Sequence, residues 1–209
     1  MIKEIYDNYF PKDQHRLAIK ISGGVDSGFA AFYTAKYIVD NKLPHSIQPI
    51  IIRESTAPFQ PDFATHVLHI VSNLTGFNFL DEIIYDFDGE NKLEFMRRIE
   101  REQFNSGIDV IISGITLSPD DNDFNSKEDG PIDPRTTVHS NFLKEPLGNY
   151  FCPLISVTKK QVANLYEEYG LMDTLFPYTR SCTEETMDFS KHCGKCWWCE
   201  ERKWAFGIL

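Results

Sequence analysis

The chain has 209 residues, of which 42% are hydrophobic and 25% charged, with 16 Phe and 9 Tyr; this composition is typical of a compact globular protein and excludes an intrinsically disordered chain. The formal net charge of −10 argues against a dedicated nucleic-acid binder, because the overall field repels phosphates. No apolar run reaches the roughly 20 residues that cross a bilayer, and the N-terminus carries acids where a signal peptide is basic, so we expect a cytoplasmic protein with no membrane partner.

Strands and helices are predicted to alternate up to residue 114. The predicted strands are residues 16–21, 46–52, 77–85 and 109–114. The predicted helices between them are residues 27–39, 62–74 and 91–104. Alternation at these lengths indicates βαβ units, and therefore a parallel sheet with helices on both faces. The predicted fold class is α/β: a Rossmann-like, doubly wound parallel sheet of about five strands.

Apolar periodicity disappears between residues 115 and 144, a stretch with clustered acids and Pro-containing turns. A loop of this length is typical of a functional lid or a disordered segment. A fifth strand is predicted at residues 150–156, where Cys152 among apolar neighbours indicates a buried, unreactive thiol. A helix should follow up to residue 169, with Thr158 as its N-cap and Gly170 at its end.

Residues 22–27 (SGGVDS), here called the SGGVDS turn, join the first strand to the first helix. Backbone N–H groups at a helix N-terminus have no intrahelical partner and carry partial positive charge, so they bind anions, and paired glycines allow a close approach. The expected phosphate-binding residues are Ser22, Gly23, Gly24, Val25, Asp26 and Ser27. Asp26 is also a candidate magnesium ligand. The alternative is a tight turn in which Asp26 or Ser27 only caps the helix.

Four of the five cysteines lie near the C-terminus, at Cys182, Cys193, Cys196 and Cys199. The last three form two overlapping CxxC spacings, which let sulfurs converge on one metal. Four thiolates complete a tetrahedral zinc site with no open position, so we predict a structural Zn²⁺ site, or zinc knuckle. An iron–sulfur cluster and a redox dithiol remain open as alternatives.

The SGGVDS turn matches the SGGxDS signature of the PP-loop superfamily, the N-type ATP pyrophosphatases. With the cysteine set and the stretch PLISVTK at residues 153–159, the sequence resembles, thinly through most of its length, the 7-cyano-7-deazaguanine synthase (QueC) family. The resemblance implies an ATP- and Mg²⁺-dependent C–N ligase of queuosine biosynthesis. Its partners would be a deazapurine carboxylate, 7-carboxy-7-deazaguanine, and ammonia: ATP adenylates the carboxylate, ammonia displaces AMP, and a second ATP drives dehydration to the nitrile.

The resemblance also suggests site residues and organisation. Asp26, Lys159 and Arg135 are the candidate catalytic residues, although Lys159 equally fits a solvated surface charge. We also expect Ile52, Arg53 and Gly114 to contact the nucleotide. Residues 1–156 would form the PP-loop ATP-binding α/β domain and residues 157–209 a helical, four-cysteine zinc region, in a homodimer.

The sequence differs from the family pattern at residues 53–58, at residues 130–135 and at Arg180, the positions that would recognise the acceptor substrate. Two other functions therefore stay open. One is a PP-loop tRNA thiolation enzyme, which requires a basic RNA-binding surface. The other is a non-catalytic nucleotide-binding protein whose metal site serves an interface.

Overall fold

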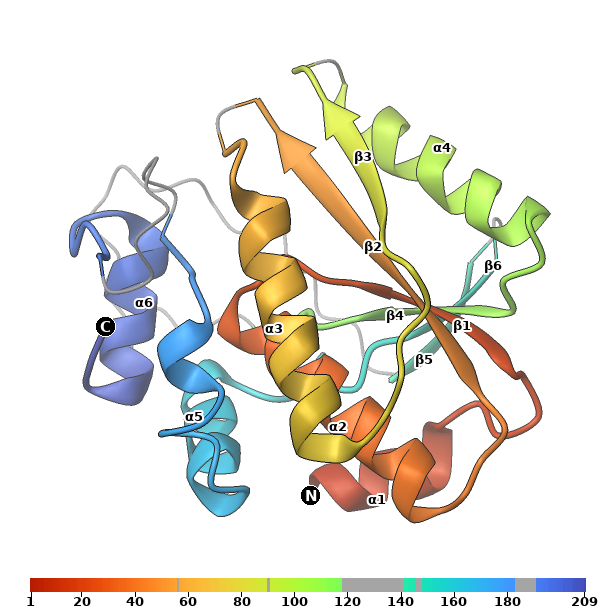
Figure 1. Cartoon of the computed structure of the whole chain (residues 1–209), viewed down its shortest axis with the longest axis horizontal. Coiled ribbons are helices and arrows are strands. Elements are labelled where there is room, and N and C mark those ends of the chain that lie inside the picture. The colour runs from red at the N-terminus through yellow and green to blue at the C-terminus, as the bar shows by residue number, and fades with distance from the viewer. Residues whose placement is uncertain (56, 90, 118–140, 146–147, 183–190) are drawn as a thin grey trace.

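The computed structural model describes residues 1–55, 57–89, 91–117, 141–145, 148–182 and 191–209 (Figure 1). Its helices are α1 (Ile2–Tyr9), α2 (Val25–Asp40), α3 (Gln60–Thr75), α4 (Lys92–Asn105), α5 (Lys159–Glu168), the short 3-10 helix η1 (Phe176–Tyr178) and α6 (Trp197–Phe206). Its strands are β1 (Arg16–Lys20), β2 (Ser46–Glu54), β3 (Ile83–Phe87), β4 (Val110–Ser113), β5 (Phe142–Glu145) and β6 (Gly148–Phe151).

One sheet with the strand order β3-β2-β1-β4-β6-β5 runs through the molecule. All neighbouring strands are parallel except the edge pair β5 and β6, which is antiparallel. The predicted α/β fold class is confirmed, with six strands in the described residues where about five were expected. The order reverses at β1, which lies between β2 and β4. In open parallel sheets, ligands bind beyond the carboxyl ends of the strands at such a switch point.

Helices cover both faces of the sheet (Figure 1). On one face, Leu17 and Ile19 of β1 belong to a buried cluster with residues of α1, α2, α3 and α5, while Ala18 faces a smaller cluster that includes Phe95 and Ile99 of α4. Alternate residues of the same strand thus supply two cores, which explains why the strands read as continuous apolar runs. Because α5 shares the larger core, residues on both sides of position 156 pack together; the proposed division into two regions stays a prediction.

Three predicted strands are found within two residues of their predicted limits, and two differ by more. The prediction for residues 77–85 is wrong for residues 77–82, because β3 begins at Ile83; Phe77 is buried and packs with Phe79 outside a strand. The strand predicted at residues 150–156 is β6, which ends at Phe151. Pro153 has no N–H to donate to a neighbouring strand, and the chain turns there, with the Ile155 amide donating to the Cys152 carbonyl.

The long segment predicted as a loop contains β5 near its end. Residues 118–140 lie outside the described part of the chain, and so do the acidic segment and Arg135. The predicted helix start at Thr158 is confirmed: the Thr158 side chain accepts from the Gln161 amide, and the Gln161 side chain accepts from the Thr158 amide, forming a capping box. Helices α1 and α6 were not predicted. None of the described helices is both long and apolar enough to span a bilayer.

Cys152 is 2% exposed, and burial raises the pKa of its thiol to about 11. Since the thiolate is the reactive form, we expect iodoacetamide at pH 8 not to modify Cys152 in the folded protein. Peptide mass spectrometry measures the extent of modification. Protein unfolded in guanidinium chloride should react fully at the same position. Rapid labelling of the folded protein at Cys152 would contradict the buried placement.

Candidate active site and metal centre

The SGGVDS turn (residues 22–27) runs from the carboxyl end of β1 into the first turn of α2, which begins at Val25 with Gly24 as its N-cap. Gly23 has a positive φ of 79°, and a Cβ atom there would lie 2.8 Å from Cβ of Phe63 and 2.9 Å from its carbonyl carbon. Glycine is therefore required both for the backbone conformation and for the closeness of α3. The carbonyl of Gly23 accepts a hydrogen bond of 2.8 Å from the Arg180 amide, which joins the turn to the C-terminal part of the chain.

The two serine hydroxyls of the turn face each other, with 3.1 Å between the Oγ atoms of Ser22 and Ser27. The Ser22 amide donates to Ser27 Oγ at 3.2 Å, so the turn is closed on itself. Gly114, which follows β4, passes beside it: a Cβ on Gly114 would lie 2.8 Å from Cα of Ser27. The ends of β1 and β4 thus meet at the start of α2, where the orphan amides of the helix are located.

Lys159 contacts the turn directly. Its ammonium donates to Oδ2 of Asp26 and lies 3.2 Å from Oε2 of Glu201 in α6. Lys159 is 3% exposed, so the alternative of a solvated surface charge is wrong. Among the residues that the structure describes, the buried Oδ1 atom of Asp26 has no hydrogen-bond partner. Such an unpaired carboxylate oxygen beside the turn fits a ligand for Mg²⁺, which prefers oxygen.

Two adjoining cavities open around the turn, and both are lined by Ser22, Asp26, Ser27, Glu54, Gln60, Lys92 and Trp198. The first, the aromatic cavity, has a volume of about 530 Å³, and its walls include Phe59, Phe63, Lys92, Arg180, Ser181 and Trp198. The second, the strand-end cavity, has a volume of about 420 Å³, and its walls include Lys20, Ile50, Ile52, Met96, Ile99 and Gly114. Trp198 also borders the second cavity, so one side chain of α6 touches both. Volumes of this size accommodate small organic ligands.

The wall around Arg180 is fixed by Arg202. The Arg202 guanidinium donates to the carbonyl of Phe176 at 3.0 Å and to the carbonyl and hydroxyl of Thr179 at 3.2 and 2.9 Å. It also lies 3.9 Å from the Phe176 ring centre, a cation–π contact. Burial lowers the pKa of Arg202 to about 10, so it remains protonated near neutral pH. Arg202 thereby fixes residues 176–179, which directly precede Arg180, whose amide donates to the Gly23 carbonyl in the turn.

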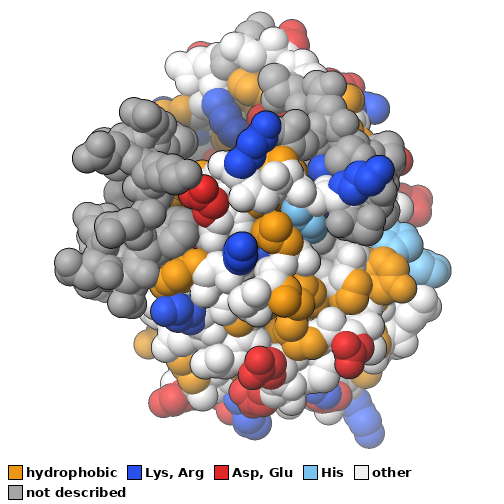
Figure 2. Space-filling model, turned by 90° about the vertical axis from the view of Figure 1, so that its left-hand side faces the viewer, with side chains coloured by type: hydrophobic (Ala, Val, Ile, Leu, Met, Phe, Trp, Pro, Cys, Tyr) orange, Lys and Arg blue, Asp and Glu red, His pale blue; other side chains and the backbone are white. Residues whose placement is uncertain are grey.

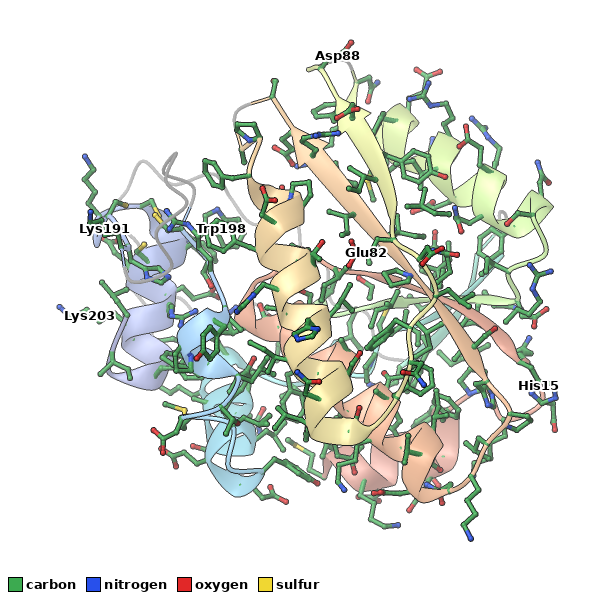
Figure 3. The ribbon with its side chains drawn as sticks, viewed as in Figure 1. His15, Glu82, Asp88, Lys191, Trp198 and Lys203 are labelled. Atoms are coloured by element: carbon green, nitrogen blue, oxygen red, sulfur yellow. The ribbon has the colours of Figure 1, made fainter. Side chains whose placement is uncertain are left out.

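The four predicted metal ligands lie together: the sulfurs of Cys182, Cys193, Cys196 and Cys199 are all within 4.8 Å of one another. Figure 3 shows sulfur atoms gathered near the start of α6, the end that also carries Trp198. Four thiolates about 2.3 Å from one ion are roughly 3.8 Å apart, and Cys193 Sγ lies 3.9 Å from Cys199 Sγ. An iron–sulfur cubane inserts its own iron and sulfide atoms between the thiolates and needs a wider set. The donor set therefore fits a single tetrahedral ion.

The structure adds residues that were not among the predicted catalytic or nucleotide-binding residues. They are Gln60 and Lys92 in the cavity walls, Glu201 beside Lys159, and Glu54 and Arg180, which the sequence marked only as departures from the family. Of the predicted nucleotide contacts, Ile52 and Gly114 line the strand-end cavity. Arg53 lines neither cavity; its Nε donates to Asp86 at 2.6 Å. Arg135 lies outside the described residues. For Arg180 the only sequence signal was its position before Cys182, whereas Glu201 had no signal at all.

Comparison with known proteins gives one family and several related structures. A family model described as queuosine biosynthesis protein QueC matches residues 147–209, less than a third of the chain. The chain superposes on the structure of the U34-tRNA thiolase NcsA from Methanococcus maripaludis with its four-iron–four-sulfur cluster (TM-score 0.54, 14% identity, covering 99% of this chain and 76% of that one). This likeness shows the fold. No curated protein sequence matches significantly.

Two further solved structures resemble the chain more distantly. NMN synthetase from Francisella tularensis gives a TM-score of 0.47 at 11% identity, covering 100% of this chain and 84% of that one. NAD+ synthetase from Burkholderia pseudomallei gives a TM-score of 0.43 at 14% identity, covering 100% of this chain and 79% of that one.

Proposed function

We propose that this chain is a PP-loop enzyme that uses ATP to transfer AMP to a carboxylate and releases pyrophosphate; the match to the QueC family model and the SGGVDS turn support this. The SGGVDS turn carries this proposal. It combines a glycine backbone pressed against α3 with the N-terminus of α2 and a cavity large enough for a nucleotide and an acceptor. A phosphate chain at that turn would meet backbone N–H groups and the positive end of the helix dipole.

The two cavities suggest separate positions for the two substrates. The strand-end cavity has an apolar wall formed by Ile50, Ile52 and Ile99, which suits a flat adenine ring, with the phosphates at the turn. The aromatic cavity offers Phe59, Phe63 and the shared Trp198 for a planar acceptor, and Arg180 for its negative charge. The reacting carboxylate would then reach the α-phosphate at the boundary between the cavities, and the walls would supply positioning and charge stabilisation.

7-Carboxy-7-deazaguanine is planar and anionic, so it fits the aromatic cavity, and it is also the acceptor that the QueC resemblance implies. Attack of its carboxylate on the α-phosphate gives an acyl-adenylate and pyrophosphate, and ammonia then displaces AMP with loss of a proton to give the amide. A second ATP adenylates the amide oxygen with release of pyrophosphate and one amide proton, and departure of AMP with loss of the remaining N–H proton leaves the nitrile, 7-cyano-7-deazaguanine. Lys159 would hold Asp26 and stabilise charge at the turn, and Asp26 would bind Mg²⁺, which neutralises the phosphates when bound.

The cysteine set is proposed to hold Zn²⁺, because the sulfur spacing suits one tetrahedral ion and a closed thiolate site is structural. Thiolate metal sites persist in reducing compartments, which supports a cytoplasmic location. We also propose a homodimer; light scattering coupled to size-exclusion chromatography would measure its mass, and a monomer at working concentration would refute it.

A tRNA thiolation enzyme is the main alternative function. It would need a basic surface for the RNA backbone, whereas the chain has a net charge of −10. On the described part of the face that carries α5 and α6, lysine and arginine side chains lie scattered among hydrophobic and acidic ones (Figure 2). A non-catalytic nucleotide-binding protein is the second alternative; it would bind ATP without forming pyrophosphate.

The test is incubation with ATP, Mg²⁺, ammonium and 7-carboxy-7-deazaguanine, with mass spectrometry of the deazapurine and measurement of AMP and pyrophosphate. We expect the nitrile and AMP. The variant Asp26→Asn should be slower by about 100-fold or more, the scale on which removal of one electrostatic group at a reacting centre acts. Asp62→Asn, an exposed first-turn aspartate of α3, should match the wild type and is the control for charge removal.

The possible outcomes distinguish the proposals. AMP formation with another acceptor would retain adenylation and refute the deazapurine substrate. Binding of ATP with no AMP from any of a panel of carboxylates would favour the non-catalytic alternative. Sulfur transfer to tRNA, detected as thiolated nucleoside, would favour the thiolation enzyme, and absence of ATP binding would refute all three.

A further inference from the structure

Glu201 is a buried carboxylate that none of the steps above uses. It is 1% exposed and belongs to α6, yet its Oε2 lies 3.2 Å from the Lys159 ammonium. The same ammonium donates to Oδ2 of Asp26 in the SGGVDS turn. One lysine is therefore shared between two carboxylates, one in the turn and one in the helix that follows the cysteine set.

Local structure fixes both ends of this contact. Lys159 is the first residue of α5, whose start is held by the Thr158 capping box. Helix α6 starts directly after Cys196, its N-cap, and contains Cys199 in its first turn, two residues before Glu201. Helices α5 and α6 lie side by side (Figure 1). A metal ion held by the cysteine set would thus fix the helix end that carries Glu201.

Stability alone does not account for three charged groups in this position. Desolvation of buried ions offsets most of their mutual attraction, so a buried ion pair contributes little net stability compared with apolar residues of similar size. The Lys159 ammonium and the Glu201 carboxylate are both almost fully buried, and both lie beside the partly buried Asp26 of the turn. A buried lysine that bridges two carboxylates at the wall of a cavity is therefore a candidate for a functional role.

We propose that Glu201 is a positioning residue that anchors Lys159 so that Asp26 can bind Mg²⁺; this inference rests on the proposed function. Without Glu201, Asp26 is the remaining ionic partner of the ammonium among the described residues, and the ammonium then competes with Mg²⁺ for that carboxylate. With Glu201 present, the ammonium stays in place when Asp26 turns its unpaired Oδ1 atom toward the ion. Glu201 thereby lowers the Mg²⁺ concentration that nucleotide binding requires.

The test measures nucleotide binding as a function of Mg²⁺ and needs no acceptor. ATP is titrated by calorimetry into metal-loaded wild type, Glu201→Gln and Glu200→Gln over a series of Mg²⁺ concentrations. We expect Glu201→Gln to raise the Mg²⁺ concentration for half-maximal binding about tenfold, a typical scale for coupling between close buried charges, with ATP affinity at saturating Mg²⁺ within about threefold of wild type. Glu200→Gln removes the same charge one residue away, at a partly exposed position, and should change neither quantity.

A double-variant cycle separates positioning from a general structural effect. If Glu201 acts through Lys159, Lys159→Gln and the double variant Lys159→Gln/Glu201→Gln should have the same Mg²⁺ requirement. Should Glu201→Gln not fold, Glu201→Asp keeps the charge but withdraws it from Lys159, and a smaller shift in the same direction is expected.

Each other result counts against a specific claim. Equal shifts in Glu201→Gln and Glu200→Gln, no shift in Glu201→Gln or Glu201→Asp, or additive effects in the double variant would overturn the role of Glu201 while leaving ATP binding intact. A wild type that binds no ATP at any Mg²⁺ concentration would overturn the proposed function, and this inference with it.

Discussion

Replacement of Gly23 by alanine is expected to abolish ATP binding and to destabilise the fold by about 2–5 kcal/mol. Two effects add. A residue with a side chain is strained at the φ of 79° found there, and the new Cβ would lie 2.8 Å from Cβ of Phe63 and 2.9 Å from its backbone carbon. Because the obstructing atoms belong to α3, the turn must move away from the helix, and its amides lose their alignment for phosphates.

Gly76→Ala is the matched control. Gly76 has a similar φ of 73°, at the C-terminal end of α3, but a Cβ there meets no atom within 4 Å. It should lose only about 1–2 kcal/mol from backbone strain and keep full ATP affinity. Thermal unfolding and calorimetric ATP titration measure both quantities. If the two variants were equally stable and both bound ATP, the tight contact between the turn and α3 would be refuted.

The features predicted from sequence are those encoded within short stretches. Hydrophobic runs and their spacing indicated the α/β class and the parallel sheet, and the SGGVDS turn could be assigned to a strand–helix junction from six residues. The cysteine spacing likewise indicated one metal site, which the grouping of the four sulfurs supports. Each of these depends on neighbours close in the chain, where local geometry leaves few possibilities.

The features that escaped prediction depend on residues brought together only by folding. Lys159 and Glu201 are 42 positions apart in the sequence. Nothing in the residues that flank either one in the sequence indicates that both side chains are buried. Arg180 stands before a cysteine in the sequence, but its amide bonds to Gly23 at the other end of the chain. Periodicity in the sequence predicts which face of a helix or strand is apolar. It does not predict which charged residue from a distant part of the chain pairs with a buried lysine.

Element limits were missed for a related reason. Residues 77–82 have the aromatic and apolar character of a strand, yet Phe77 and Phe79 pack on each other and into the core before β3 begins. Burial of a β-prone segment can be achieved without strand pairing, because propensity for strands mainly reflects a fit to half-buried surfaces. Tertiary packing therefore decided where the strand starts.

Cys199→Ser is expected to release the metal ion and to lower the unfolding midpoint by about 10 °C, given that 1 kcal/mol corresponds to roughly 2–4 °C for a protein of this size. Cys199 is fully buried at 0% exposure, within the first turn of α6, and burial raises the pKa of its thiol. Binding of an ion deprotonates such a thiol and couples the ion's affinity to folding. Loss of one ligand removes that coupling and leaves a hydroxyl buried among thiols.

Cys152→Ser provides the matched control for a buried cysteine. Cys152 is 2% exposed and lies outside the cysteine set, so its variant should keep one ion per chain and lose only a few degrees. Elemental analysis measures the bound metal, and thermal unfolding with and without a chelator measures its contribution. We expect the chelator to lower the wild-type and Cys152→Ser midpoints to near that of Cys199→Ser, and to leave Cys199→Ser unchanged. Zinc in the wild type would support the single-ion geometry, whereas four irons with sulfide would refute it. A Cys199→Ser protein as stable as Cys152→Ser would show that the ion does not hold α6 in place.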